Sequence, residues 1–213
     1  MKNEDGEFDS HGWVKLAYRF STETLDDIAT LKPHLGRGQR LTDMQALQRK
    51  LPASFKAELE SYGFLPIPNR AVGFIKTKDK NWSLPWHQDR VIAMPSKQNL
   101  AAYSNWSRKS GIWHCEPLVQ VLRNMAFAYI AFDDMPHGRG GLELAEGTHL
   151  DGIIENIEID DIVKNKTITK PNLMRGDVLL ISALTLHRSA TLSGSDVRRA
   201  LRLDFERRNH DYT

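Results

Sequence analysis

The sequence predicts a mainly β fold, a jelly-roll barrel with helices in its N-terminal third. The first observation is a change of pattern near Gly63. Before it, capping residues and Gly or Pro stops outline helices; after it, short apolar runs alternate with Gly, Pro and Asn, as in strands and turns. The second is that no internal repeat or low-complexity linker divides the chain. A jelly roll limits exposed strand edges, so it is the architecture we expect here.

Three helices are expected before Gly63. The first covers 24–35 after the capping sequence at Ser21, and the second covers 42–51 and stops before Pro52. The third covers 54–62 and ends at Gly63, a favourable residue just past a helix end. A further short helix is expected over 118–124, and strands are expected over 71–75, 91–93, 125–132, 142–145, 178–181 and 200–205.

The chain is expected to be one domain over residues 1–213. Within it we predict a flexible tail over 1–12, a mostly helical segment over 13–63 and a jelly-roll core over 64–206. The hydrophobic share of 40% and charged share of 26% predict a folded core rather than disorder.

Charge and cysteine content narrow the class of protein. The formal net charge of +2 does not indicate a nucleic-acid or acidic-membrane partner. The only cysteine, Cys115, excludes an internal disulfide or a cysteine-based metal cluster and suits a reducing compartment. The polar N-terminal residues do not resemble a signal peptide, and no apolar run is long enough to cross a bilayer. We therefore expect a cytoplasmic protein and leave its oligomeric state open.

A candidate metal site consists of His87, Asp89 and His187. On an extended segment a His-x-Asp pair presents both side chains on one face, because strand side chains alternate. By itself such a pair also fits a hydrogen-bonded couple on a surface strand. A second histidine on a distant strand completes a set of two imidazoles and one carboxylate, which leaves metal positions open for a co-substrate and dioxygen.

Arg198 begins the strand after His187 and is a candidate carboxylate-binding residue, since arginine grips a carboxylate through two parallel hydrogen bonds. Ser189 offers a further donor. Arg199 competes for the same role. Alternation puts Arg198 on the polar face of its strand, which we expect to line the cavity, and Arg199 on the apolar face under the helices.

Three blocks of sequence resemble the phytanoyl-CoA dioxygenase family of Fe(II)- and 2-oxoglutarate-dependent oxygenases, roughly over residues 71–206. They are Trp86-His87-Gln88-Asp89, the segment from Gly140 to His149, and the segment from Gly176 to Ser189 followed by Arg198. The middle block is similar to the family's Gly-x-Leu-x-x-x-Pro-Gly-Ser-His segment, with Glu146 in place of proline and Thr148 in place of serine.

The resemblance implies a double-stranded β-helix, a cupin-like jelly roll. It implies iron held by His87, Asp89 and His187, which makes these the catalytic residues. It also implies that 2-oxoglutarate is bound by Arg198 with the help of Ser189. Around Lys76 and Trp106 the sequence is similar to family regions that face the co-substrate, so these two residues are candidate co-substrate contacts. The alternatives are that Lys76 is exposed to solvent and that Trp106 packs in the core.

The implied activity is hydroxylation of a C–H bond of a small organic molecule, with O2 consumed and succinate and CO2 released. Related iron halogenases carry a small residue in place of the carboxylate, so Asp89 favours hydroxylation; desaturation and cyclisation stay open. One alternative is a cupin-type metal enzyme that does not use 2-oxoglutarate, which leaves Arg198 without a purpose. The other is a non-catalytic jelly-roll binding protein. A nucleic-acid demethylase is supported only by the C-terminal arginines, and Asp204 and Glu206 interrupt that basic run.

Overall fold

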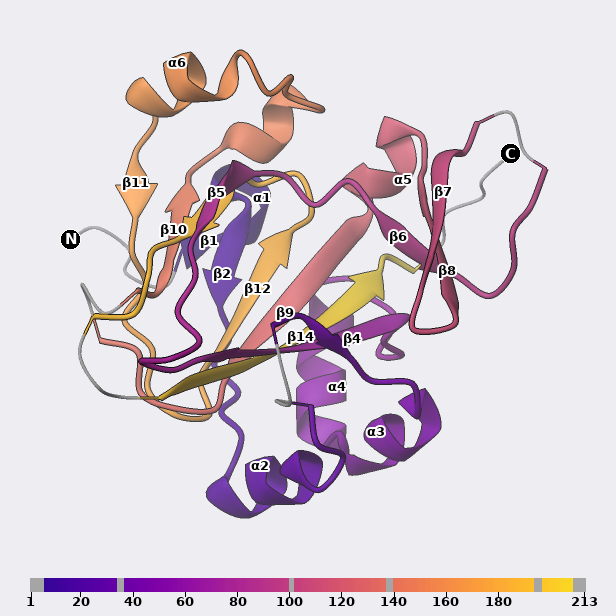
Figure 1. Cartoon of the computed structure of the whole chain (residues 1–213), viewed down its shortest axis with the longest axis vertical. Coiled ribbons are helices and arrows are strands. Elements are labelled where there is room, and N and C mark those ends of the chain that lie inside the picture. The colour runs from indigo at the N-terminus through magenta and orange to yellow at the C-terminus, as the bar shows by residue number, and fades with distance from the viewer. Residues whose placement is uncertain (1–5, 34–36, 100–101, 137–139, 194–196, 209–213) are drawn as a thin grey trace.

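A computed structural model describes residues 6–33, 37–99, 102–136, 140–193 and 197–208. Within these ranges one sheet has seven strands (Figure 1). In spatial order they are β1 (Gly6–Glu7), β2 (Trp13–Lys15), β12 (Val178–Ser182), β9 (Met125–Ala131), β14 (Arg198–Glu206), β4 (Arg70–Lys76) and β3 (Gln39–Arg40). All neighbouring pairs are antiparallel.

Two smaller sheets complete the β structure of the described residues. One consists of β11 (Ile168–Thr169), β10 (Leu142–Ala145), β13 (His187–Ser189) and β5 (Leu84–His87). The other consists of β6 (Ile92–Met94), β8 (Ile112–Glu116) and β7 (Ser104–Lys109). The four-stranded sheet lies over one face of the large sheet (Figure 1), which gives the double-stranded β-helix that the sequence predicts.

Helices cover the other face of the large sheet. They are α2 (Thr22–Ala29), α3 (Met44–Lys50) and α4 (Ala53–Ser61), and Figure 1 shows them together below β9, β14 and β4. The remaining helices are α1 (Phe8–His11), α5 (Val119–Arg123), the 3₁₀ helix η1 (Thr148–Asp151) and α6 (Ile159–Lys164). None of the helices in the described part of the chain is long and apolar enough to cross a membrane.

Alternation along the central strands divides the core into two layers. On β9, Ala128 and Ile130 belong to the cluster under the helices, whereas Phe127 and Tyr129 face the space between the two larger sheets. Because successive strand residues point to opposite faces, a continuous apolar run can fill both layers. The β9 run therefore serves both the helical layer and the interior of the barrel.

The predicted helices and strands are largely observed. The helix predicted over 24–35 ends at Ala29, and residues 34 and 35 lie outside the described ranges. The other boundaries differ by at most two residues. The clearest difference is at the N-terminus, where residues 6–12, predicted as part of a flexible tail, form β1 and α1 and bury Phe8. Residues 1–5 of that tail lie outside the described ranges. The segment 13–63 is also less helical than expected, because β2 joins the large sheet beside β12 and β3 joins it beside β4.

Candidate metal and co-substrate site

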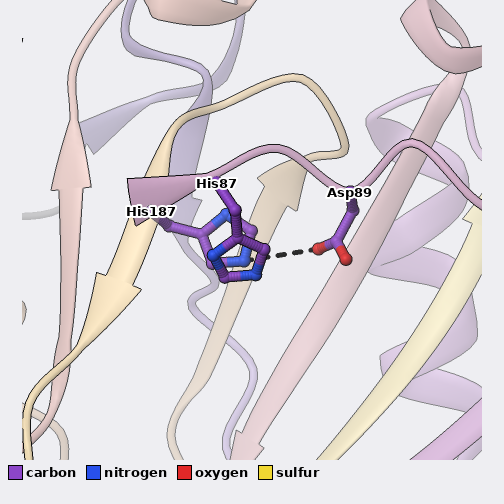
Figure 2. Close-up of side chains that lie close together, drawn as sticks. All are labelled: His87, Asp89 and His187. Carbon is purple, nitrogen blue, oxygen red and sulfur yellow. Dashed lines mark ion pairs between the residues drawn. The ribbon is translucent and has the colours of Figure 1, made fainter. Parts of the chain in front are cut away.

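The two histidines of the site are direct partners in one antiparallel ladder. His187 on β13 is in register with His87 on β5, and a bulge follows between His187 and Ser189. Opposed residues in an antiparallel pair point to the same side of the sheet and lie close together. The two imidazole rings accordingly have centroids 4.3 Å apart (Figure 2).

Asp89 lies just beyond the end of β5, so only His87 of the predicted extended His-x-Asp segment belongs to a strand. The position of Asp89 is fixed by its backbone N–H, which donates to the Ala183 carbonyl at 2.9 Å. The Gln88 side chain points away and bonds to the backbone of Gly152, Leu184 and Ile154. These contacts keep the His87 and Asp89 side chains on one side of the segment, although β-sheet pairing ends at His87. As a result, Asp89 Oδ2 lies 3.3 Å from His187 Nε2 (Figure 2).

Backbone carbonyls orient both imidazoles. His87 Nδ1 lies 2.9 Å from the Pro85 carbonyl oxygen, and His187 Nδ1 lies 2.9 Å from that of Thr185. A carbonyl accepts only, so each Nδ1 carries the proton and each Nε2 keeps a lone pair for a metal. One ligand atom from each of His87, Asp89 and His187 lies within 4.8 Å of the others. Ligands at about 2.1 Å from one ion are at most about 4.2 Å apart, so the group has only a short distance to close.

The electrostatics of the group favour the protonation states that bind metal. Burial, followed by the neighbouring His187, lowers the pKa of His87 to about 4, so this imidazole is neutral at pH 7. Burial would raise the pKa of Asp89, but Arg202 and His187 outweigh it and hold that pKa well below its usual value. A neutral imidazole and an ionised carboxylate are the forms that coordinate a cation.

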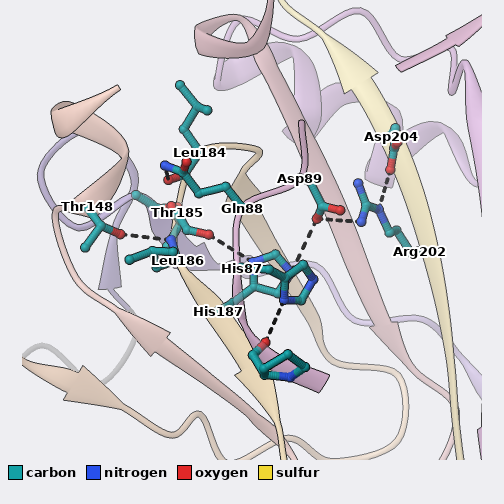
Figure 3. Close-up of polar contacts among 12 residues, drawn as sticks. His87, Gln88, Asp89, Thr148, Leu184, Thr185, Leu186, His187, Arg202 and Asp204 are labelled. Carbon is teal, nitrogen blue, oxygen red and sulfur yellow. Dashed lines mark hydrogen bonds and ion pairs between the residues drawn. The ribbon is translucent and has the colours of Figure 1, made fainter. Parts of the chain in front are cut away.

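Arg202 also contacts the site, although no sequence motif points to it. Its Nη1 lies 2.5 Å from Asp89 Oδ2, and its Nε donates to Asp204 Oδ1 at 2.6 Å (Figure 3). The one available signal was its position on the polar face of β14, four residues after Arg198. That signal indicates which way the side chain points, but not that it reaches Asp89 from another sheet.

A cavity of about 180 Å³ opens beside the metal ligands. The cavity is lined by His87, Asp89 and His187 and by the polar residues Ser189, Arg198 and Arg202. Its remaining lining consists of apolar and aromatic side chains, namely Phe74, Trp82, Leu84, Phe127, Tyr129 and Leu142. Arg198 is buried there, and among the described residues its Nη1 has no hydrogen-bond partner. A buried guanidinium N–H without a partner is costly, so this atom marks a place for an anionic ligand.

Lys76 is fully buried beside this part of the cavity. It is the cross-strand partner of Arg198, its Nζ donates to Ser189 Oγ at 3.1 Å and to the Ala190 carbonyl, and it lies 4.4 Å from the Trp82 ring. Burial, followed by the charge of Arg198, lowers the pKa of Lys76 to about 7. The solvated alternative for Lys76 is therefore wrong, and a bound carboxylate would favour its charged form.

The two remaining candidates lie away from the cavity. Arg199 points to the other side of β14, where its guanidinium binds Asp133 at 2.6 Å. Trp106 lies on β7, donates its Nε1–H to the Tyr103 carbonyl at 3.2 Å, and packs edge-on against Trp113 with the ring centroids 6.3 Å apart. The structure brings His87, Asp89, His187, Ser189 and Arg198 to one cavity, but it does not bring Arg199 or Trp106 there.

The donor set fits a divalent transition metal. Two imidazole nitrogens and one carboxylate on one side of the ion leave the other positions to small ligands, which is the arrangement of non-haem iron oxygenases. The buried, unpaired donor of Arg198 fits a 2-oxo acid whose far carboxylate reaches it. Fold and site together are those expected of a metal-dependent jelly-roll enzyme of the two-histidine, one-carboxylate class.

Comparison with known proteins identifies the family. The model of the phytanoyl-CoA dioxygenase (PhyH) family matches residues 68–200, and the chain belongs to this family. The family uses Fe(II), 2-oxoglutarate and O2, so the protein is a 2-oxoglutarate-dependent non-haem iron dioxygenase, as the sequence predicts. No curated protein sequence matches the chain.

Solved structures share the fold at low identity. AviO1 from Streptomyces viridochromogenes Tue57 is 13% identical, with a TM-score of 0.63 over 93% of this chain and 91% of that one. The non-heme alpha ketoglutarate dependent carbocyclase SnoK is 14% identical, with a TM-score of 0.62 over 97% and 84%. HygX from Streptomyces hygroscopicus, solved with nickel and 2-oxoglutarate, is 15% identical, with a TM-score of 0.58 over 94% and 84%.

Proposed function

We propose that this dioxygenase hydroxylates a C–H bond of a small organic molecule, with His87, Asp89 and His187 holding the iron. The convergence of their three ligand atoms within 4.8 Å, from β5, its following segment and β13, is the observation that carries this proposal. The carbonyl-bound Nδ1 atoms support it, since they leave both Nε2 atoms available. HygX, which shares the fold, has been solved with iron bound.

Arg198 binds the far carboxylate of 2-oxoglutarate in this proposal. Nη1 of its buried guanidinium has no hydrogen-bond partner in the described part of the chain, and Ser189, which lines the same cavity, supplies a hydroxyl. Lys76 adds a second positive charge behind Ser189 once the carboxylate is present. Ser189 and Arg198 line the same cavity as the histidines, so a 2-oxo acid bound to them would have its other end toward the metal.

Iron with 2-oxoglutarate supplies the oxidising chemistry, and the chain's residues position the reactants and keep water out. Phe74, Leu84 and Leu142 line the cavity with apolar surface. The cavity of about 180 Å³ is smaller than the roughly 300–1,000 Å³ usual for a ligand pocket. It therefore suits the co-substrate, and the substrate presents a C–H group from the mouth.

The direct test is the metal-dependent binding of 2-oxoglutarate. Calorimetry with Ni²⁺ under nitrogen is expected to show one 2-oxoglutarate per chain, with no binding when the metal is omitted. Addition of Fe²⁺ and oxygen is then expected to release succinate, measured by mass spectrometry. The matched control is His187→Ala, which keeps Arg198 but removes a metal ligand. If the unmodified protein loaded with Ni²⁺ bound no 2-oxoglutarate, the proposal would be contradicted.

The proposed compartment is the cytoplasm. The single thiol, Cys115, is buried and free, which suits a reducing environment. Fractionation of cells that produce the tagged protein is expected to place it with the cytosolic enzymes, and recovery from a secreted or membrane fraction would contradict this assignment.

A further inference from the structure

One oxygen of the Asp89 carboxylate lies between a histidine of the site and an arginine of the large sheet. Arg202 Nη1 lies 2.5 Å from Asp89 Oδ2, the same oxygen that faces His187 Nε2 at 3.3 Å (Figure 3). A carboxylate bound this closely by a guanidinium has a restricted rotation, because turning it would break a charge-assisted contact. The orientation of the third metal ligand is therefore set by a residue on β14, in the opposing sheet.

Arg202 is itself held in a buried chain of charges. Its Nε donates to Asp204 Oδ1 at 2.6 Å, and Asp204 Oδ2 accepts from Arg70 at 2.5 Å. The guanidinium also lies 4.2 Å from the centre of the Phe127 ring. Since Arg202, Asp204 and Arg70 are all buried, the chain has little freedom to rearrange.

The two arginines on the cavity face of β14 have different surroundings. Arg202 has a carboxylate partner on each side, whereas the Nη1 of Arg198 has no partner among the described residues. The unpaired group is suited to bind a ligand that comes and goes. The paired group is suited to hold a part of the protein in place.

We infer that Arg202 is a positioning residue that fixes the rotation of Asp89, so that its Oδ2 stays turned toward the two histidines. Without this ion pair the carboxylate could turn Oδ2 away, and the three ligand atoms would no longer converge. The inference rests on the proposed function, because it assigns Asp89 as a metal ligand. It adds a structural reason why the third ligand stays aligned with the other two.

The test measures metal binding without 2-oxoglutarate. Titration of Arg202→Gln with Ni²⁺ is expected to give about 10- to 100-fold weaker binding than the unmodified protein, the usual cost of removing a residue that orients a metal ligand. The absorption spectrum of the Co²⁺ form, which reports coordination number and geometry, is expected to change. Arg202→Lys should recover little, because an ammonium group cannot reach both carboxylates in a planar fork.

Arg199→Gln is the matched control. It removes a neighbouring arginine of the same strand whose partner, Asp133, is away from the site, so metal affinity and the Co²⁺ spectrum should stay unchanged. If Arg202→Gln does not fold, Asp204→Asn provides the second variant. It keeps the contact of Arg202 with Asp89 but weakens its anchor, and a smaller loss of metal affinity with a partial spectral change is expected.

Unchanged or tighter metal binding by Arg202→Gln, with the spectrum of the unmodified protein, would overturn the inference. So would a higher substrate KM with unchanged metal affinity, which would make Arg202 a substrate-binding residue. Failure of the proposed function looks different, since the unmodified protein would then bind Ni²⁺ but no 2-oxoglutarate.

Discussion

The two faces of β14 show how one strand serves stability and chemistry separately. Leu201, Leu203 and Phe205 point toward the helices and are completely buried in the cluster below the large sheet. Arg198 and Arg202, on alternate positions, point to the cavity. Both faces are buried, so exposure does not distinguish them. The difference is chemical, and it teaches that a buried charge on a strand facing a cavity indicates a site, whereas its apolar neighbours indicate a core.

The largest effect is expected where the cavity face meets the metal. Asp89→Ala removes the carboxylate that Arg202 holds and that completes the metal-binding group. We expect succinate release to fall below detection under Fe²⁺, 2-oxoglutarate and oxygen, while the helix-facing core is unchanged. Thermal unfolding of the metal-free variant provides the control. Retained turnover would show that Asp89 is not a metal ligand.

A substitution on the helix-facing side of β14 should lower the stability of the protein and leave 2-oxoglutarate binding unchanged. Leu203→Ala deletes a fully buried side chain that packs with the helical layer, and a loss of about 2–5 kcal/mol in the free energy of unfolding is expected. Urea denaturation measures it. Because Leu203 points away from the cavity, calorimetry below the unfolding transition should give an unchanged dissociation constant for 2-oxoglutarate. A weakened constant would mean that the two faces are coupled.

Adjacent arginines of β14 allow a sharper comparison. Arg198→Gln is expected to raise the KM for 2-oxoglutarate about 10- to 100-fold, consistent with the loss of about 1.5–3 kcal/mol from a hydrogen bond to a charged group. Arg199→Gln breaks a partly exposed ion pair with Asp133, which contributes about 1 kcal/mol or less to stability, and should leave that KM unchanged. Initial rates at varied 2-oxoglutarate measure both. If Arg199→Gln raised the KM for 2-oxoglutarate and Arg198→Gln did not, Arg199 would be the residue that binds the carboxylate.

At pH 7 the smallest effect is that of Lys76, and it grows as the pH rises. Because burial and the charge of Arg198 lower the pKa of Lys76 from 10.5 to about 7, the free protein loses this charge as pH rises above 7. Binding of a carboxylate then requires proton uptake, so 2-oxoglutarate affinity should fall from pH 7 to 9 by at most about tenfold per unit. Lys76→Met should flatten that dependence, as calorimetry across this pH range would show. If the pH dependence of 2-oxoglutarate affinity were the same in Lys76→Met, a group other than Lys76 would be responsible for it.

Much of the site could be predicted because it depends on local pattern. Alternation on the strand beginning at Arg198 predicted that this residue faces the cavity and that Arg199 faces the helical side, and both orientations are observed. The His-x-Asp pattern and the distant His187 predicted which side chains converge, although β5 ends at His87 and hydrogen bonds of Gln88 and Asp89 replace the strand.

The parts that could not be predicted depend on contacts between distant segments. Residues 6–12 resemble a polar tail by composition, but β2 pairs with β12 and draws the preceding residues into the fold. The contact of Arg202 with Asp89 joins different sheets, so no spacing along the chain reveals it. The family resemblance suggests Trp106 only from its place in the sequence, which does not determine where β7 and β8 turn.

The register of His87 with His187 has a consequence for how this enzyme can change. Main-chain pairing fixes the separation of the two imidazoles, and the wall residues Phe74 and Leu142 take no part in that pairing. Substitutions on this wall can therefore change the shape of the cavity without moving the two imidazoles apart. A library randomised at these wall positions should keep metal loading in most of its members, which makes the scaffold a practical starting point for the directed evolution of a differently shaped cavity.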